Sequence, residues 1–112
     1  MAFSTDMQVN SGIAKITLSG ELDASVASTL QSQVEQAAAQ RAMRLVLLMS
    51  DLDYMASAGL RALIFAKQKM GMDVDLYVVG AQPQVMEVIQ KTGFDRSIIA
   101  LAEYDPAVIE NL

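Results

Sequence analysis

One segment in the middle of the chain gathers side chains that could do chemistry. It carries two carboxylates, Asp51 and Asp53, and the hydroxyl of Ser57. Two carboxylates can act as a general acid and a general base, but solvated loop carboxylates are the favoured interpretation of this pair. Ser57 has no imidazole to activate it, because the chain contains no His, and it lacks the first glycine of a G-x-S-x-G turn. The segment therefore predicts no catalytic site.

The amino-acid composition excludes further classes of function. The 112 residues include no Cys, no His and no Trp, which excludes disulfides, thiolate nucleophiles, Cys/His zinc sites and His-based triads. The sequence contains neither a G-x-x-x-x-G-K-S/T nor a G-x-G-x-x-G phosphate-binding motif. With 13 acidic and 8 basic residues, a net charge of −5 disfavours nucleic acid and anionic membranes as partners. We expect a binding module with no catalytic residue, cofactor or metal.

The N-terminal residues are expected to form a β-hairpin. Apolar and polar residues alternate over residues 12–19, which predicts a strand, and residues 3–8 suit an edge strand before it. The turn-forming residues 10–12 would join the two strands in antiparallel fashion. Residues 20–23 are expected to end the second strand.

A helix and a central strand are predicted next. Apolar residues recur at helical spacing from Val26 onward, and either Asp23 or Ser25 could cap this helix by accepting hydrogen bonds from its first N–H groups. Residues 45–49 form a continuous apolar run, which is typical of a strand covered on both faces. Residues 50–56 are expected to form a loop.

Gly and Pro punctuate the second half of the chain, where they separate segments of regular apolar spacing. Gly71 is expected to end a helix, Pro83 to begin another, and Gly93 to stop it. The predicted elements are a helix to about residue 70, a strand at 74–79, a helix at 83–93, a strand at 98–101, and a terminal helix from Asp105 that turns Val108 and Ile109 inward.

The order of these elements, ββαβαβαβα, defines the expected fold class. Strands that alternate with helices predict an α/β domain with a mostly parallel, mixed sheet of four to five strands and about four helices. The antiparallel hairpin would form one edge of the sheet. We expect one domain over residues 1–112. The N-terminus lacks a signal-peptide pattern and no apolar stretch reaches about 18 residues, so a cytoplasmic location is expected.

Ser57 lies where the N-cap of a helix is expected. A phosphoryl group on its hydroxyl would lie at the positive end of the helix dipole, and Arg61, four residues on, is close enough along the helix to approach it. A plain capping serine is the structural alternative. Met55 is the methionine best placed for a partner surface, because it would share an exposed loop with Ser57.

Two motifs of this chain resemble those of STAS domains, the fold of bacterial anti-sigma factor antagonists. The segment Asp-Tyr-Met-Ala-Ser-Ala-Gly-Leu-Arg at residues 53–61 is similar to the family's signature loop, and Leu-Ser-Gly-Glu-Leu-Asp at 18–23 to its G-E-L-D turn. The resemblance implies a protein of transcription regulation that binds an anti-sigma factor, usually also a serine kinase. The kinase would phosphorylate Ser57 and weaken binding, and a PP2C-type phosphatase would reverse the reaction. Asp23 corresponds to the family's acidic residue near the phosphorylated serine.

This chain departs from the family at two positions of the signature loop. Many members have Asp-Ser-Ser/Thr-Gly where this chain has Ala56-Ser57-Ala58-Gly59. The resemblance implies a monomer when free. The alternative function is a STAS signalling or adaptor module, stressosome-like or for small-ligand or lipid transfer, without control by phosphorylation. The residues expected to bind the partner are Asp23, Tyr54, Met55, Ala56, Ser57, Ala58, Gly59 and Arg61.

Overall fold

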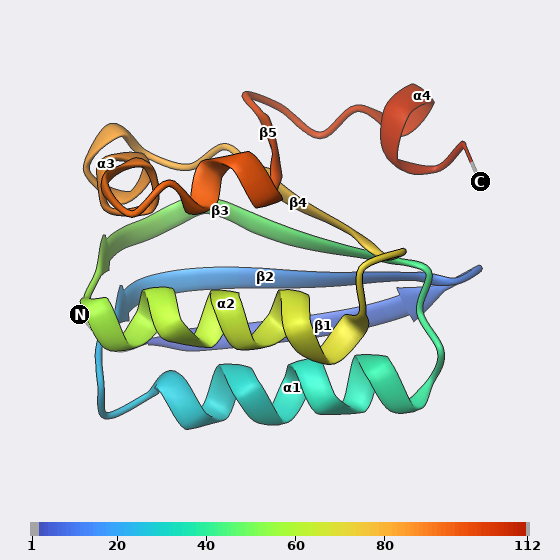
Figure 1. The fold of residues 1–112 in the computed structure, drawn as a ribbon, viewed down its shortest axis with the longest axis horizontal. Coiled ribbons are helices and arrows are strands. Elements are labelled where there is room, and N and C mark those ends of the chain that lie inside the picture. The colour runs from blue at the N-terminus through green and yellow to red at the C-terminus, as the bar shows by residue number, and fades with distance from the viewer. Residues whose placement is uncertain (1–2, 112) are drawn as a thin grey trace.

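The structure, a computed structural model, describes residues 3–111. These residues form a five-stranded mixed sheet in the order β1-β2-β3-β4-β5, in which only the β1–β2 pair is antiparallel (Figure 1). The expected α/β fold class and the order ββαβαβαβα are confirmed. The elements are β1 Ser4–Asn10, β2 Ile13–Leu22, α1 Ala27–Ala39, β3 Arg44–Met55, α2 Ser57–Met70, β4 Asp75–Val79, α3 Pro83–Lys91, the 3-10 helix η1 Phe94–Ser97, β5 Ile99–Leu101 and α4 Pro106–Ile109.

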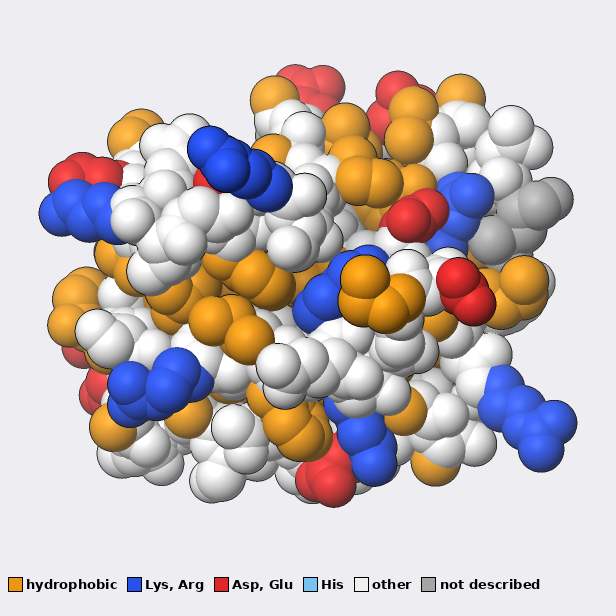
Figure 2. Space-filling model, in the orientation of Figure 1, with side chains coloured by type: hydrophobic (Ala, Val, Ile, Leu, Met, Phe, Trp, Pro, Cys, Tyr) orange, Lys and Arg blue, Asp and Glu red, His pale blue; other side chains and the backbone are white. Residues whose placement is uncertain are grey.

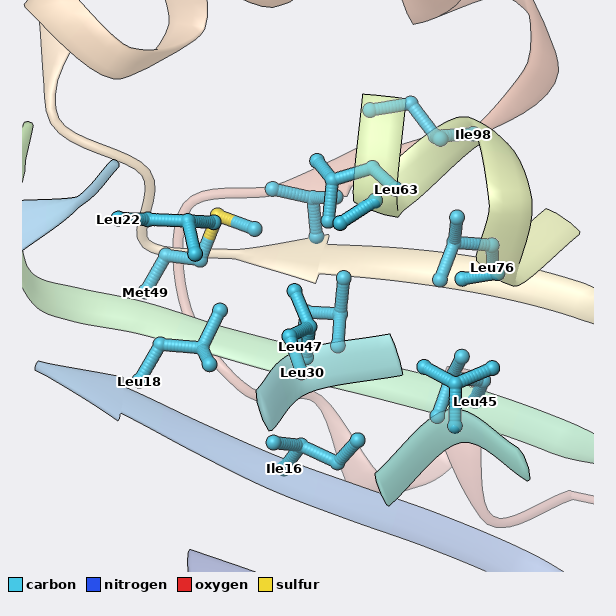
Figure 3. Close-up of a cluster of buried hydrophobic side chains, with 14 of the residues drawn as sticks. Ile16, Leu18, Leu22, Leu30, Leu45, Leu47, Met49, Leu63, Leu76 and Ile98 are labelled. Carbon is cyan, nitrogen blue, oxygen red and sulfur yellow. The ribbon is translucent and has the colours of Figure 1, made fainter. Parts of the chain in front are cut away.

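The main hydrophobic core lies between one face of the sheet and helices α1, α2 and α3. Helices α1 and α2 run side by side along this face (Figure 1). Alternate residues of each strand point into the core, because successive side chains of a strand face opposite sides of the sheet. Figure 3 shows Ile16 and Leu18 of β2, and Leu45 and Leu47 of β3, directed toward Leu30 of α1 and its neighbours.

The opposite face of the sheet is covered in part by the C-terminal segment. Ile109 of α4 is fully buried against a small apolar cluster of Ile13, Val46, Tyr77 and Val79. A guanidinium nitrogen of Arg44 donates hydrogen bonds to the carbonyls of Val108 (2.6 Å) and Ile109 (2.7 Å). Ile109 points inward as expected, but the same prediction for Val108 is wrong, because this side chain is 42% exposed.

Strands β2 and β3 are longer than the sequence predicts. Residues 20–22 continue β2, and residues 50–55 continue β3 instead of forming a loop. The two extensions pair with each other in parallel, with register shifts between Thr17 and Ser19 and between Gly20 and Glu21. Pairing between the strands thus satisfies the backbone N–H and C=O groups of a polar stretch whose side chains alone suggested a loop.

Neither Asp23 nor Ser25 caps α1, so that prediction is wrong. The helix begins one to three residues later than a cap at Ser25 or Asp23 would place it, with Val26 at the N-cap and no side-chain capping bond within the described residues. The Asp23 carboxylate instead accepts from the N–H and hydroxyl of Ser25, which forms a local Asx-type turn before the helix.

Glu110 links the C-terminal segment to β2 electrostatically. It accepts a hydrogen bond from the Tyr104 hydroxyl and lies 3.4 Å from the Lys15 ammonium, which also stacks over the Tyr104 ring at 4.5 Å. The hydrogen bond from Tyr104, followed by the hydrogen bond and the positive charge of Lys15, lowers the pKa of the Glu110 carboxyl below its ordinary value of 4.5.

Replacing Glu110 should make stability depend on pH in a defined direction. A carboxyl with a lowered folded-state pKa stabilises the fold above its unfolded pKa, and this stabilisation is lost as the pH falls through the folded value. Glu110→Gln should lower the Tm by roughly 2 °C at neutral pH and have no effect in strong acid. Thermal unfolding of both proteins across the acid range would measure this, and a difference independent of pH would contradict it.

Candidate functional site

The two sequence motifs lie side by side where β2 and β3 end. Glu21 pairs with Tyr54 and Leu22 with Met55, and the N–H of Ala56 donates to the Leu22 carbonyl at 2.9 Å. The end of the G-E-L-D segment is therefore bonded directly to the residue that precedes Ser57. Because these strands are parallel, both motifs reach the carboxyl edge of the sheet, where α/β proteins commonly place functional groups.

Ser57 is the first residue of α2, and Ala56 occupies the N-cap with extended backbone angles. The prediction of Ser57 as the N-cap is therefore wrong by one residue, because the pairing of β3 with β2 continues to Met55 and α2 starts directly after it. No side chain in the described part of the chain caps α2. Ser57 is exposed in the first turn of the helix, whose N–H groups carry the positive end of the dipole.

Burial divides the predicted site residues into an outer and an inner set. Tyr54 is 49% exposed, and Ser57 and Arg61 are exposed. Met55 is only 2% exposed and packs in the core, so the expectation that it lies in a surface loop is wrong. Gly59 is also buried, whereas Asp23, Ala56 and Ala58 are half-buried. The exposed and half-buried residues form the outer set, which solvent or a partner can reach. The inner set, Met55 and Gly59, is buried beneath it. The outer set consists of Asp23, Tyr54, Ala56, Ser57, Ala58 and Arg61.

Gly59 allows α2 to approach the end of β2 closely. A Cβ atom added to Gly59 would lie 2.7 Å from Cγ of Leu22 and 2.8 Å from its carbonyl oxygen. Real Cβ atoms essentially never come this close to other heavy atoms, so a larger residue would push the first turn of α2 away from β2. The position of Ser57 thus depends on the absence of a side chain two residues later.

Asp23 carries a stabilised negative charge at the rim of the site. The Ser25 hydroxyl donates to its Oδ1 at 2.6 Å and the Ser25 N–H to the same oxygen at 2.9 Å. Both bonds lower the pKa of the Asp23 carboxyl, and the bond from the Ser25 hydroxyl has the larger effect.

Removing one of the two donors should raise the pKa of Asp23. Ser25→Ala deletes the hydroxyl but leaves the backbone donor, so the carboxyl pKa should move part of the way back to its ordinary value. An NMR titration of the Asp23 carboxyl carbon measures this, with the exposed Ser28→Ala as a matched control. An unchanged pKa in Ser25→Ala would show that the hydroxyl does not stabilise the carboxylate.

Asp51 and Asp53 have different surroundings rather than a shared site. Asp51 lines a cavity of about 360 Å³ on the face of the sheet that α4 covers, together with Thr17 and Tyr104. Asp53 accepts a hydrogen bond from the Gln82 amide at 3.2 Å. Among residues 3–111, no group of three His, Cys, Asp or Glu side chains is arranged to hold a metal ion.

Two residues of the candidate site, Gln82 and Gln84, were not predicted from the sequence. They precede and enter α3, and their amides bond to residues 50–53 of β3. The side-chain types alone do not indicate these contacts, because they join positions about 30 residues apart through polar side chains that any surface turn could carry. Only the position of the Gln-Pro-Gln segment after a strand, at the functional edge of the sheet, could have suggested them.

Figure 2 shows how charged side chains are distributed on one face of the molecule. Basic and acidic side chains are scattered over the face seen in Figure 2, with no continuous basic area on it. Within residues 3–111, none of the helices combines the length and the apolar character that crossing a membrane requires.

The fold and the site define a small mixed α/β protein whose candidate functional surface is an exposed strand–helix junction. The family model for the STAS domain matches residues 4–108. The chain therefore belongs to the STAS domain family, as the two motifs suggested.

Several relatives carry related names. The anti-sigma-F factor antagonist RsfB of Mycobacterium tuberculosis is 26% identical over 88 residues, which are 79% of this chain and 72% of RsfB. The crystal structure of an anti-sigma factor antagonist from Mycobacterium paratuberculosis has a TM-score of 0.87 at 24% identity, with 98% of this chain and 96% of that chain covered. The Bacillus cell fate determinant SpoIIAA in its phosphorylated form has a TM-score of 0.71 at 19% identity, with 97% of both chains covered. These structures share the fold of this chain.

Proposed function

We propose that this chain is an anti-sigma factor antagonist that binds a kinase-type anti-sigma factor and is released when Ser57 is phosphorylated. A PP2C-type phosphatase would restore the binding form. The observation that carries the proposal is the exposed Ser57 in the uncapped first turn of α2, next to the end of the G-E-L-D segment. The name of RsfB and the phosphorylated structure of SpoIIAA support it by likeness.

The local physics suits a switch by charge. A neutral hydroxyl can be covered by a partner at modest cost when it is hydrogen-bonded, but a phosphate brings about −1.5 to −2 charge that a partner surface must desolvate. The first turn of α2 contains no acidic residue among those described, so a phosphate there would meet N–H groups and the dipole favourably. The modified chain would be stable while its surface no longer suits the partner.

The proposed contact surface consists of the outer set of site residues. Tyr54 offers a large ring that is half exposed, Arg61 a cation and Asp23 a carboxylate, around the small residues Ala56 and Ala58. Such a surface supplies one aromatic anchor with polar groups at its rim, the usual composition of a protein interface. This chain would be a monomer when it is not bound to the anti-sigma factor, and it would act in the bacterial cytoplasm.

A capture experiment tests the proposal. Wild type, Ser57→Ala and Ser57→Glu are immobilised, exposed to lysate of the source organism and compared by mass spectrometry. We expect a kinase-type anti-sigma factor with wild type and Ser57→Ala, and its loss with Ser57→Glu. Phosphorylation of wild type but not of Ser57→Ala, by that purified partner and ATP, completes the test. Absence of such a partner from wild type would overturn the proposal.

A further inference from the structure

Among residues 3–111, no strand pairs with one side of the outer half of β3, residues 50–55. Pairing between β3 and β4 ends at Leu48 with Val79, whereas β3 continues to Met55. Its other side is paired with β2 as far as Leu22. The outer half of β3 carries Tyr54 and leads directly to Ser57, so the proposed contact surface is built on a strand that β4 does not support.

The chain stops pairing with β3 directly after β4 and makes a tight turn at Gly80. Gly80 adopts a left-handed backbone conformation with φ of 71°, and its N–H donates to the Leu101 carbonyl of β5 at 2.8 Å. A Cβ atom at Gly80 would lie 2.5 Å from the Ser50 hydroxyl oxygen. This tight turn brings the following residues alongside the outer half of β3.

Two glutamine side chains occupy the place of the missing strand. The Gln82 amide donates to the Ser50 carbonyl at 3.1 Å and to the Asp53 carboxylate at 3.2 Å. The Gln84 amide donates to the Asp53 carbonyl at 3.0 Å and to the Gln82 side-chain oxygen at 2.9 Å. Two carbonyl groups on the unpaired side of β3 thus receive side-chain donors, which are linked to each other.

We infer that Gln82 and Gln84 are positioning residues that hold the outer half of β3, and with it Tyr54 and Ser57, in the geometry that the partner recognises. The inference rests on the proposed function for its binding consequence alone. A strand bonded on one side opens more readily than one bonded on both sides, because local opening breaks fewer hydrogen bonds. Without the two amides the contact surface would still form, but it would be ordered for a smaller fraction of the time.

Hydrogen exchange tests the inference without a partner. In the double variant Gln82→Ala/Gln84→Ala, exchange of the amides of residues 52–55 should accelerate about five- to tenfold, because two exposed hydrogen bonds to β3 carbonyls, each of modest net strength, are lost. Gln84→Glu keeps the length of the side chain but removes its amide donor, so it should accelerate exchange at least as much as Gln84→Ala. Gln90→Ala, an exposed glutamine on the same helix, should have no effect there.

A second control separates positioning from general stability. Val88→Ala removes apolar contact from the half-buried side of α3 and should lower the Tm without accelerating exchange at residues 52–55 selectively. For the anti-sigma factor that wild type captures, Kd should rise in the double glutamine variant by the factor by which the ordered fraction of the contact surface falls, and it should stay unchanged in Val88→Ala.

Two results would overturn the inference. One is unchanged exchange at residues 52–55 in the double glutamine variant, and the other is an equal effect of Val88→Ala on exchange or on Kd. Failure of the proposed function would look different, since wild type would then capture no kinase-type anti-sigma factor while the exchange comparison would still decide the role of the glutamines.

Discussion

Ser57→Glu is expected to weaken binding to the anti-sigma factor about 100-fold while it slightly stabilises the free protein. A permanent charge at the centre of a contact surface must be desolvated on binding, and like charges brought together there cost several kcal/mol. An effect of about 2.7 kcal/mol corresponds to the 100-fold loss. In the free chain the same carboxylate lies at the uncapped first turn of α2, where it should contribute about 0.3–1 kcal/mol of stability.

The opposite signs of the two effects make this prediction specific. Calorimetry would measure Kd, and thermal unfolding the stability of the free proteins. Ser57→Ala should bind within about threefold of wild type, because it adds no charge. Ser32→Glu puts the same charge on an exposed serine in the middle of α1 and should leave Kd nearly unchanged. If Ser32→Glu weakened binding as much as Ser57→Glu, net charge rather than position would be the cause.

Apolar periodicity was sufficient to predict the fold class, because the core depends on it. Leu45 and Leu47 of β3 and Leu30 of α1 are fully buried where the pattern indicated. The glycine and proline signals were equally local, since Gly71 follows the last residue of α2 and Pro83 is the first residue of α3. Features that one segment specifies by itself could therefore be predicted from that segment.

The outer half of β3 could not be predicted, because its pattern has no regular period. Gly20 pairs with Leu52 and Glu21 with Tyr54, so Asp53 is an extra residue in β3. This bulge places two buried residues, Leu52 and Met55, three positions apart instead of two. The strand exists because β2 supplies backbone partners, and such pairing leaves no mark in the sequence of β3 alone.

The same cause limited the prediction of the site. The two motifs identified the segment and its serine, but the exact start of α2 depends on where pairing with β2 stops. Met55 was expected in a loop and is buried because its segment is a strand. Gln82 and Gln84 act through contacts with a distant strand, so they could be found only in three dimensions.

Gly59→Ala is the substitution expected to affect the fold of the site most. Helix propensity alone predicts that alanine would stabilise α2 by about 1 kcal/mol. The structure predicts the opposite, because the new methyl group would lie 2.8 Å from the Leu22 carbonyl oxygen and 2.7 Å from the Leu22 Cγ. We expect a net loss of about 2 kcal/mol, and a Tm lower by roughly 8 °C, as α2 and β2 move apart.

A double-mutant cycle would assign this loss to Leu22. In a Leu22→Ala background, the penalty of Gly59→Ala should shrink but not vanish, because the clash with the Leu22 carbonyl remains whatever the side chain. Gly71→Ala serves as the contrasting control: its φ of 102° is strained for alanine, but a Cβ there would meet no described atom within 4 Å, so its penalty should be the same in both backgrounds. An unchanged Gly59→Ala penalty in the Leu22→Ala background would show that the side-chain contact is not the cause.

Because Ser57 and Gly59 share the first turn of α2, a shift that relieves this clash should also weaken partner binding, whereas Gly71→Ala at the far end of the helix should leave Kd unchanged.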